Sequence, residues 1–307
     1  MAILLNNNGY DNESWRQELA RRLPDLPVRV YGETLEPADV RYAMVWNHPA
    51  GDLCRYPNLR AIFSLGAGGE HFIGDDSLPD VPIVLLADPA VARDMTAHAL
   101  YWVVTFHRRY EDYRNQQSQK VWNRKKVVPA ENFRVGIVGL GRIGTEVAQR
   151  IGGFGYDVSG WDCAERQIQN VDCFCGPEFL SDFLEINDII INCLPLSRTT
   201  KHFLSHKFFS SMKRGSYFIN ISRGAVVDDD ALLRALDSGH LARAALDVFA
   251  HEPLPQDHPY WSHAKVSVTP HMSGATFASS AAAVVAENVR KLERGDPVQP
   301  LFDRKAL

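Results

Sequence analysis

The sequence predicts an α/β protein of two doubly wound domains, each with a parallel sheet covered by helices on both faces. Three observations support this fold class. The chain has 307 residues, of which 45% are apolar and 23% charged, and this is enough for two domains with cores of their own. Short apolar runs alternate with helical patterns along most of the chain. A glycine-rich turn connects a strand to a helix near its middle.

In the first third of the chain, strand patterns alternate with helical ones. The predicted strands of this part are residues 3–5, 42–46, 61–65 and 83–86. Ser14 and Gln17 stand at the two positions of a helix capping box, which leads into Leu19 and Leu23 at helical spacing. Residues 91–117 follow the pattern of one long helix, after which we expect a solvated connection.

The rest of the chain repeats the alternation and so predicts a second parallel sheet. Its expected strands are residues 133–138, 157–161, 189–194, 217–221, 244–249 and 266–269. The final helix, residues 277–294, is rich in alanine and valine and stops before Gly295, with a proline soon after. We expect a discontinuous first domain, residues 1–98 with 276–307, and an inserted second domain, residues 99–275.

The charge of the chain argues for a small-molecule partner. The formal net charge is -4, from 33 basic and 37 acidic residues, which gives no electrostatic footprint for nucleic acid or an anionic membrane. The first residues lack the basic and apolar regions of a secretory signal, and no apolar run is long enough to span a membrane. We therefore expect neither nucleic acid nor a membrane as partner.

The cysteines are odd in number and include no Cys-x-x-Cys pair, which argues against a disulfide framework and a zinc ribbon. They are Cys54, Cys163, Cys173, Cys175 and Cys193. Such cysteine usage is typical of a reducing compartment, and we expect the cytoplasm. Three histidines gather near the end of the second sheet, but without a helical i, i+4 pair or a cysteine partner they predict no metal site. They are His251, His258 and His263.

The glycine-rich turn comprises Gly139, Gly141 and Gly144, in the pattern G-x-G-x-x-G. It follows an apolar strand and opens a helix, which is the setting that dinucleotide binding requires. Gly139 permits a tight turn, Gly141 lets the backbone approach a pyrophosphate, and Gly144 lets the helix pack closely on the strand. The helix N-terminus then faces the phosphates, so this part is predicted to be a Rossmann-like cofactor domain.

Asp162 ends the next predicted strand, where a carboxylate would accept hydrogen bonds from the adenosine ribose diol. The same charge repels a 2′-phosphate, which favours NAD over NADP. Arg166 follows four residues later and could bind such a phosphate if Asp162 turned away. We expect NAD as the cofactor and keep NADP as the alternative.

Three polar residues, Arg223, Glu252 and His271, each follow a strand of the second predicted sheet. Ligands of open α/β sheets bind at this edge. Taken singly, the three also fit a surface arginine, a turn glutamate and a structural histidine. Their combination is more specific than any one of them.

With the glycine turn, these residues resemble the D-2-hydroxyacid dehydrogenase family over nearly the whole chain. The stretches that carry the resemblance are VGIVGLGRIGTEVA, NISRGAVVDDDALLRAL, ALDVFAHEPLP and VTPH, in the family's order and spacing. The resemblance implies hydride transfer between a nicotinamide cofactor and a small 2-keto or D-2-hydroxy acid. Arg223 would hold the substrate carboxylate, His271 would act as the acid/base, and Glu252 would orient His271 and favour its protonated form.

The resemblance also implies two sets of binding residues. Cofactor contacts are expected from Gly139, Gly141, Arg142, Ile143, Gly144, Asp162, Leu194, Pro195, Thr200, Ile221, Ser222, Arg223, Asp247, His271 and Ser273. Substrate contacts are expected from Trp46, Leu65, Gly66, Ala67, Gly68, Arg223 and His271, in a cleft between the domains. In the substrate loop, Gly69 and Glu70 replace the family's usual bulkier apolar residue and aspartate.

Within the family, MVWNHP, FSLGAGG and LERGDPV are most similar to the glyoxylate/hydroxypyruvate reductase A branch. That branch commonly has serine and arginine for NADP where this chain has Asp162-Cys-Ala-Glu165. The resemblance further implies a homodimer, formed with the help of residues 91–117. Two alternatives stay open: a dehydrogenase for another 2-hydroxy acid, and a dinucleotide-binding regulator of the corepressor type. The complete set of catalytic residues and the lack of long tails favour the enzyme.

Overall fold

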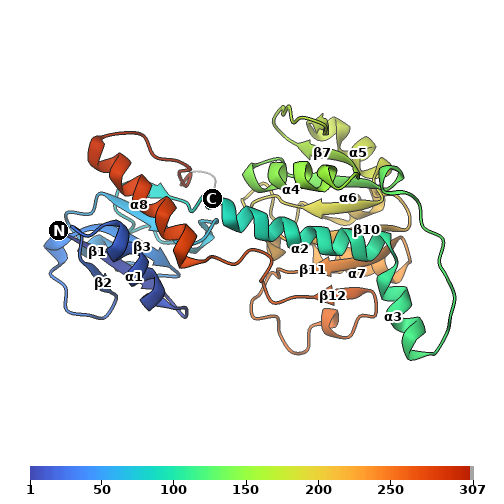
Figure 1. Cartoon of the computed structure of the whole chain (residues 1–307), viewed down its shortest axis with the longest axis horizontal. Helices are drawn as coiled ribbons and strands as arrows, with labels where there is room; N and C mark the ends of the chain where they lie inside the picture. Colours follow the sequence, from blue (N-terminus) through green and yellow to red (C-terminus); the bar gives the residue numbers. More distant parts are fainter. Residues whose placement is uncertain (305–307) are drawn as a thin grey trace. The chain divides into compact units, whose positions relative to one another are not determined.

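The computed structural model describes residues 1–304, which form two compact units (Figure 1). Unit 1 joins Met1–Val91 to the C-terminal residues from Thr276 onward, and unit 2 is Ala92–Ala275. Both units are α/β with parallel sheets, which confirms the predicted fold class. The sequence analysis placed the boundaries of the two functional domains at residues 98/99 and 275/276, and these boundaries stay predictions.

Unit 1 contains a five-stranded parallel sheet in the order β2-β1-β3-β4-β5. Its strands are β1 Ala2–Asn7, β2 Val28–Val30, β3 Val40–Trp46, β4 Ala61–Ser64 and β5 Ile83–Val84. Helices α1 (Asn12–Arg22) and α8 (Ala278–Arg294) lie side by side and cover one face, where Ile3 and Leu5 point (Figure 1). Leu4 points to the other face, as the two-residue period of a strand requires. The sequence analysis missed β2, whose three residues are too short to show that period.

Helix α1 begins one turn earlier than the capping box predicts. Its N-cap is Asp11, whose carboxylate accepts hydrogen bonds from the backbone N–H groups of Glu13 and Ser14 at 2.8 and 3.1 Å. The Ser14 hydroxyl also donates to Asp11. The predicted cap at Ser14 was therefore wrong, because an aspartate three residues upstream satisfies the free N–H groups instead.

Unit 2 contains a seven-stranded parallel sheet in the order β12-β11-β10-β9-β6-β7-β8. Its strands are β6 Arg134–Val138, β7 Asp157–Asp162, β8 Asp172–Cys175, β9 Ile189–Asn192, β10 Ser216–Asn220, β11 Leu241–Leu246 and β12 Val266–Val268. Its helices after β6 are α4 Arg142–Gly153, α5 Leu180–Ile186, α6 His206–Ser211 and α7 Asp229–Asp237. The strand order reverses between β6 and β9, and ligands of open α/β sheets bind outside the carboxyl ends of the strands at such a reversal. The sequence analysis missed the edge strand β8.

The long helix predicted over residues 91–117 is in fact two helices, α2 (Pro89–His107) and α3 (Tyr110–Ser118). Arg109 breaks the helix because its backbone has a left-handed φ of 62°. The buried ring of His107 stays in the core of unit 2, whereas α3 buries no residue. After α3 the chain runs as a loop along the outside of unit 2 (Figure 1), as the predicted connection requires.

The last helix, α8, agrees with its prediction. It ends at Gly295, whose left-handed φ of 76° closes the helix and lets its N–H donate to Leu292 O at 3.2 Å. Within residues 1–304, none of the helices combines the length and the apolar character needed to cross a membrane.

Candidate active site at the carboxyl ends of the strands

The glycine turn between β6 and α4 has the geometry that its pattern predicts. Gly139 has a φ of +91°, and a Cβ there would lie 2.9 Å from Leu194 N. A Cβ at Gly144 would lie 1.9 Å from Gly139 O, so only glycine lets α4 pack this closely. A Cβ at Gly141 would meet nothing within 4 Å. The turn is therefore tight on its protein side and open where a ligand would approach.

Helix α4 starts at this opening. Gly141 is its N-cap, and no side chain of the described residues caps the first turn. Arg142 and Ile143 are the first helical residues, and Arg142 is exposed. Backbone N–H groups at a helix start bind anions, so the residues present fit the pyrophosphate of a dinucleotide.

Asp162 is the last residue of β7 and lies against the glycine turn. Its carboxylate accepts hydrogen bonds from Leu140 N at 2.8 Å and from Ala164 N at 3.0 Å. The nearest guanidinium nitrogen of Arg166, Nε, is 3.7 Å from the same carboxylate. The negative charge thus stands beside the glycine turn, where the sequence analysis expected it, and Arg166 faces this charge.

Two buried asparagines, Asn192 and Asn220, hold the turns after β9 and β10. Asn192 Nδ2 donates to Asn220 Oδ1 at 3.0 Å, and the two side-chain oxygens accept from Leu194 N and Ser222 N at 3.1 Å each. The Ser222 hydroxyl donates to Leu194 O, which joins the two turns. The sequence analysis missed both asparagines, although each follows an apolar run as the last residue of its strand.

The same two turns contain other residues that were predicted to contact the cofactor. Thr200 Oγ1 donates to Pro195 O at 2.6 Å and so closes the turn after β9. Ile221 is buried directly after β10. These residues therefore follow the carboxyl ends of β9 and β10, the edge of the sheet where ligands of open α/β sheets bind.

Arg223 follows the turn after β10 and is half-buried. Its Nη1 donates to Ser222 O at 2.6 Å. The next residue, Gly224, is pressed against the neighbouring loop, because a Cβ there would lie 1.9 Å from the carbonyl carbon of Phe249. Glycine at this position therefore brings the Arg223 turn against the loop that carries Glu252.

Glu252 and His271 form a close pair. Glu252 Oε2 accepts from His271 Nδ1 at 2.6 Å, and Glu252 Oε1 accepts from Phe249 N at 2.9 Å. Burial alone would raise the pKa of Glu252, but these hydrogen bonds and the charges of His271 and Arg223 outweigh it and lower the pKa below its ordinary value. Glu252 is therefore a carboxylate near neutral pH, and the proton of the pair is on Nδ1.

The other ring nitrogen of His271, Nε2, forms no hydrogen bond with any described residue. The His271 side chain is 42% exposed and that of Glu252 is 34% exposed. His271 can thus present Nε2 to a ligand while Glu252 fixes the ring from behind.

Asp247 holds the backbone that carries His271. The fully buried carboxylate accepts from Thr269 Oγ1 at 2.6 Å, from Met272 N at 3.0 Å and from Ser273 N at 2.8 Å. Its carbonyl oxygen accepts from His271 N at 2.8 Å. His271 has a left-handed φ of 51°, which costs a non-glycine residue on the order of 1–3 kcal/mol. Asp247 offsets this strain and sets the direction of the imidazole.

The residues predicted to bind substrate in unit 1 lie close to one another. Trp46 ends β3, and its ring lies on Gly66, where a Cβ would be 2.3 Å from Trp46 Cζ3. Leu65 is buried after β4, and Ala67 and Gly68 continue the same loop. The structure therefore brings Trp46 and the loop 65–68 together.

The structure explains why glycine replaces the family's bulkier residue at position 69. A Cβ at Gly69 would lie 2.2 Å from Phe302 Cδ2. The ring of Phe302, from the C-terminal segment of unit 1, thus occupies the space beside this glycine. The sequence analysis could not connect two residues so far apart in the chain.

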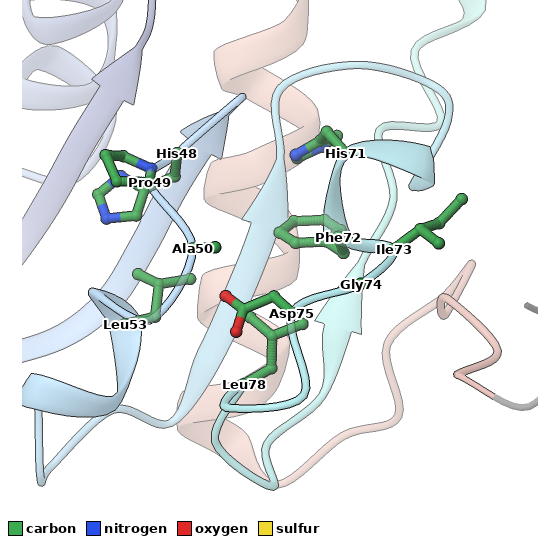
Figure 2. A pocket seen from close by; sticks show the side chains of 10 residues that line it. All are labelled: His48, Pro49, Ala50, Leu53, His71, Phe72, Ile73, Gly74, Asp75 and Leu78. Carbon is green, nitrogen blue, oxygen red and sulfur yellow. The ribbon is translucent and has the colours of Figure 1, made fainter.

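A small cavity of about 80 Å³ lies beside the substrate loop (Figure 2). His48, Ala50 and Leu53 line it on one side, and His71 and Asp75 on the other. None of the residues that line it belongs to the glycine turn or to the turns that carry Arg223 and His271.

No group of three or more His, Cys, Asp and Glu side chains among residues 1–304 is arranged to hold a metal ion. His258 Nε2 lies 3.8 Å from Asp229, and His263 Nε2 lies 3.2 Å from Asp237. These two histidines therefore face separate carboxylates.

Comparison with known proteins gives a consistent result. Residues 100–273 match the model of the NAD-binding domain of D-isomer specific 2-hydroxyacid dehydrogenases. A protein of Serratia proteamaculans named glyoxylate/hydroxypyruvate reductase A is 36% identical over 99% of this chain and 98% of its own length.

Solved structures agree with the sequence relatives. A D-isomer specific 2-hydroxyacid dehydrogenase of Xanthobacter autotrophicus, in complex with NADPH, has a TM-score of 0.96 and 36% identity, over 100% of this chain and 99% of that one. An NADPH-dependent glyoxylate/hydroxypyruvate reductase of Sinorhizobium meliloti has a TM-score of 0.93 and 27% identity, with the same two coverages.

Proposed function

Because this chain belongs to the D-isomer specific 2-hydroxyacid dehydrogenase family and is an NAD(P)-dependent oxidoreductase, we propose that it reduces a small 2-keto acid such as glyoxylate or hydroxypyruvate. The observation that carries the proposal is the pair of His271 and Glu252, which leaves Nε2 open beside the Arg223 turn. The name of the Serratia relative supports this class of substrate.

The bound nicotinamide cofactor would supply the hydride, and the protein would stabilise the negative charge of the substrate and donate the proton. Gly141, Arg142 and Ile143 would bind the pyrophosphate at the start of α4. Arg223 would hold the substrate carboxylate with its forked guanidinium and polarise the carbonyl. His271 would donate the proton on Nε2 to the alkoxide oxygen. Glu252 would stabilise the imidazolium that must be present for this step.

Further contacts would come from the remaining predicted residues. Leu194, Pro195, Thr200, Ile221, Ser222, Asp247 and Ser273 would line the cofactor site. The backbone N–H groups of the loop 65–68 would bind the substrate carboxylate, and Trp46 would limit the size of the substrate side chain. Small residues in this loop support the first role, because they leave the backbone accessible.

For the cofactor, we propose a preference for NAD, although the Xanthobacter structure contains NADPH and the Sinorhizobium enzyme is NADPH-dependent. The proposal is supported by the negative charge of Asp162 and of the exposed Glu165, which would repel a 2′-phosphate, and by Arg166, which faces Asp162. The ratio of kcat/KM with NADH to that with NADPH tests the proposal, and a ratio below one contradicts it. Asp162→Ser should shift the ratio toward NADPH, because the repulsion is removed.

The test of the activity is a steady-state panel of glyoxylate, hydroxypyruvate, pyruvate and phenylpyruvate with each cofactor. We expect the highest kcat/KM for one of the two smallest polar acids. A protein that binds NADH but reduces none of the four would support the regulator of the corepressor type instead. A preference for phenylpyruvate would support a dehydrogenase for another 2-hydroxy acid.

For the assembly, we propose a homodimer. Trp122 is fully exposed, and Tyr101, Tyr110, Val121 and Val128 are also exposed large apolar side chains of the same part of unit 2. A second copy would remove this apolar surface from water. Light scattering should give twice the monomer mass, and Trp122→Glu should lower it; a monomeric parent contradicts the proposal.

For the location, we propose the cytoplasm. Each of the five cysteines is a free thiol, as a reducing compartment maintains them. Cell fractionation with an antibody tests this point, and recovery from an extracytoplasmic fraction contradicts it.

A further inference from the structure

His71 occupies a central position beside the loop 65–68. It lies in the short 3-10 helix Glu70–Phe72, and its ring forms part of the cavity wall in Figure 2. His71 Nε2 is 3.0 Å from Ser64 Oγ. Ser64 is the last residue of β4 and is buried. A histidine therefore contacts the strand end from which the loop starts.

Ser64 links His71 to the loop by hydrogen bonds. Its hydroxyl donates to Gly68 O at 2.9 Å and accepts from Gly66 N at 3.3 Å. A hydroxyl has one hydrogen, and here it is given to a carbonyl that can only accept. His71 Nε2 therefore carries a hydrogen and donates it to Ser64. The chain of hydrogen bonds runs from His71 through Ser64 to both glycines of the loop.

The ring of His71 also contacts Trp46. The ring centroids are 4.6 Å apart with an angle of 53° between the planes. The ring of His71 also contacts Phe72, at 3.9 Å between centroids. Since the ring of Trp46 also lies on Gly66, the histidine touches both elements assigned to the substrate.

We propose that His71 is a positioning residue that fixes the loop 65–68 and Trp46 in one arrangement through Ser64. This inference rests on the proposed function. Glycine-rich loops lose much conformational entropy when they become ordered, so a loop with Gly66 and Gly68 needs an external constraint to hold its N–H groups in place. The hydrogen bond from His71 supplies that constraint before substrate binds, and this pre-organisation favours affinity for the keto acid.

The test separates the hydrogen bond from the ring contact. His71→Phe keeps a ring against Trp46 but loses the donor, whereas His71→Gln keeps a donor near the Nε2 position but loses the ring. We expect His71→Phe to raise KM for the best keto acid by about tenfold, with a smaller change in kcat. His71→Gln should stay within about threefold of the parent. The Kd for NADH should not change, because the glycine turn belongs to unit 2.

A double-variant cycle identifies the route through Ser64. Ser64→Ala should raise KM to a similar extent, and adding His71→Phe to it should raise KM no further. The matched control is His240→Phe, which removes a half-buried histidine of unit 2 whose Nε2 bonds Met212 O at 2.8 Å. This control should leave KM unchanged. Circular dichroism of each variant verifies folding. If His71→Phe does not fold, the KM of Ser64→Ala alone tests the chain of hydrogen bonds.

The outcomes are distinguishable. A parent enzyme that reduces no 2-keto acid with either cofactor overturns the proposed function. An active parent with His71→Phe within twofold in KM overturns the positioning role alone. The positioning role is also overturned if the increases in KM caused by Ser64→Ala and His71→Phe multiply in the double variant. It is overturned too if the affinity for NADH falls as much as the affinity for the keto acid, because that result would indicate a general disturbance of packing.

Discussion

A histidine–carboxylate pair lies after β3 in unit 1 and another after β11 and β12 in unit 2, and the two pairs differ in what surrounds the ring. His271 Nδ1 is 2.6 Å from Glu252, with side chains 42% and 34% exposed. His48 Nε2 is 2.8 Å from Asp52, with side chains 3% and 8% exposed. The distances are nearly the same. A short histidine–carboxylate contact therefore does not identify a catalytic site by itself.

The second nitrogen of each ring decides the role. His48 uses both nitrogens, because Nδ1 also bonds Asn6 Nδ2 at 2.8 Å. Burial lowers the pKa of His48 despite the opposing effect of Asp52, so the ring is neutral near pH 7. His271 uses one nitrogen and leaves Nε2 open. His48 is thus a brace for the loop after β3, and His271 is equipped to transfer a proton.

Removal of each histidine should give the largest difference between the pairs. His271→Gln should lower kcat/KM for keto-acid reduction by at least about a hundredfold, because positioned acid catalysis is lost. His48→Gln should change kcat/KM by less than about fivefold and lower the thermal midpoint instead. Steady-state kinetics and thermal unfolding of both variants give the measurement. Equal kinetic losses would show that the two pairs do not differ in role.

The next largest difference is expected for the arginines beside the two carboxylates, Arg223 beside Glu252 and Arg55 beside Asp52. Arg223→Lys keeps the charge but loses the fork, and should lower kcat/KM by at least about tenfold, or about 1.4 kcal/mol of transition-state stabilisation. Arg55 Nη1 lies 2.8 Å from Asp52 on an exposed side chain, and Arg55→Lys should stay within about twofold. Parent-like kinetics for Arg223→Lys would place Arg223 outside the site.

The carboxylates should differ in their effect on the pH profile. Glu252→Gln removes the negative charge that would stabilise the imidazolium needed for reduction. Reduction should then lose rate at neutral pH and recover as the solution becomes more acidic, while oxidation reaches its plateau at lower pH. The measurement is a pair of kcat/KM profiles, one for each direction. A reduction limb that stays in place or moves to higher pH would disprove the pairing of Glu252 with His271.

Asp52→Asn is the matched control for that experiment. Its pair lies in unit 1 and uses both histidine nitrogens. We expect the reduction limb of this variant to lie where it lies in the parent.

The smallest expected effect concerns stability. The pKa of His48 is lowered from its ordinary 6.5 in the folded protein, so the unfolded chain takes up a proton first as the pH falls. The neutral ring contributes its full stability above about pH 6.5, and this contribution is lost as the pH falls through the lowered folded value. Thermal midpoints from pH 8 to pH 5 should fall more steeply for the parent than for His48→Gln. Parallel slopes would mean that His48 is not buried as a neutral group.

The sequence predicted the features that depend on local patterns. Apolar runs and their spacing identified most strands, and the glycine turn with the strand-end residues identified the residues of the candidate site in unit 2. The N-cap at Asp11 and the break at Arg109 were missed, because several residues compete for a cap and nothing local marks a left-handed arginine.

Other features depend on contacts between distant parts of the chain. The pair of Asn192 and Asn220, and the ring of Phe302 beside Gly69, become visible only when separate strands and segments are brought together. Tertiary packing of this kind has no signature in a single window of sequence.

The contact between Gly224 and the backbone at Phe249 restricts how this protein could acquire new activities. Any side chain at position 224 would push away the loop that carries Glu252, so a substitution there would disturb both this loop and the Arg223 turn. Descendants of this sequence should therefore keep glycine at position 224 wherever they keep Arg223 and Glu252.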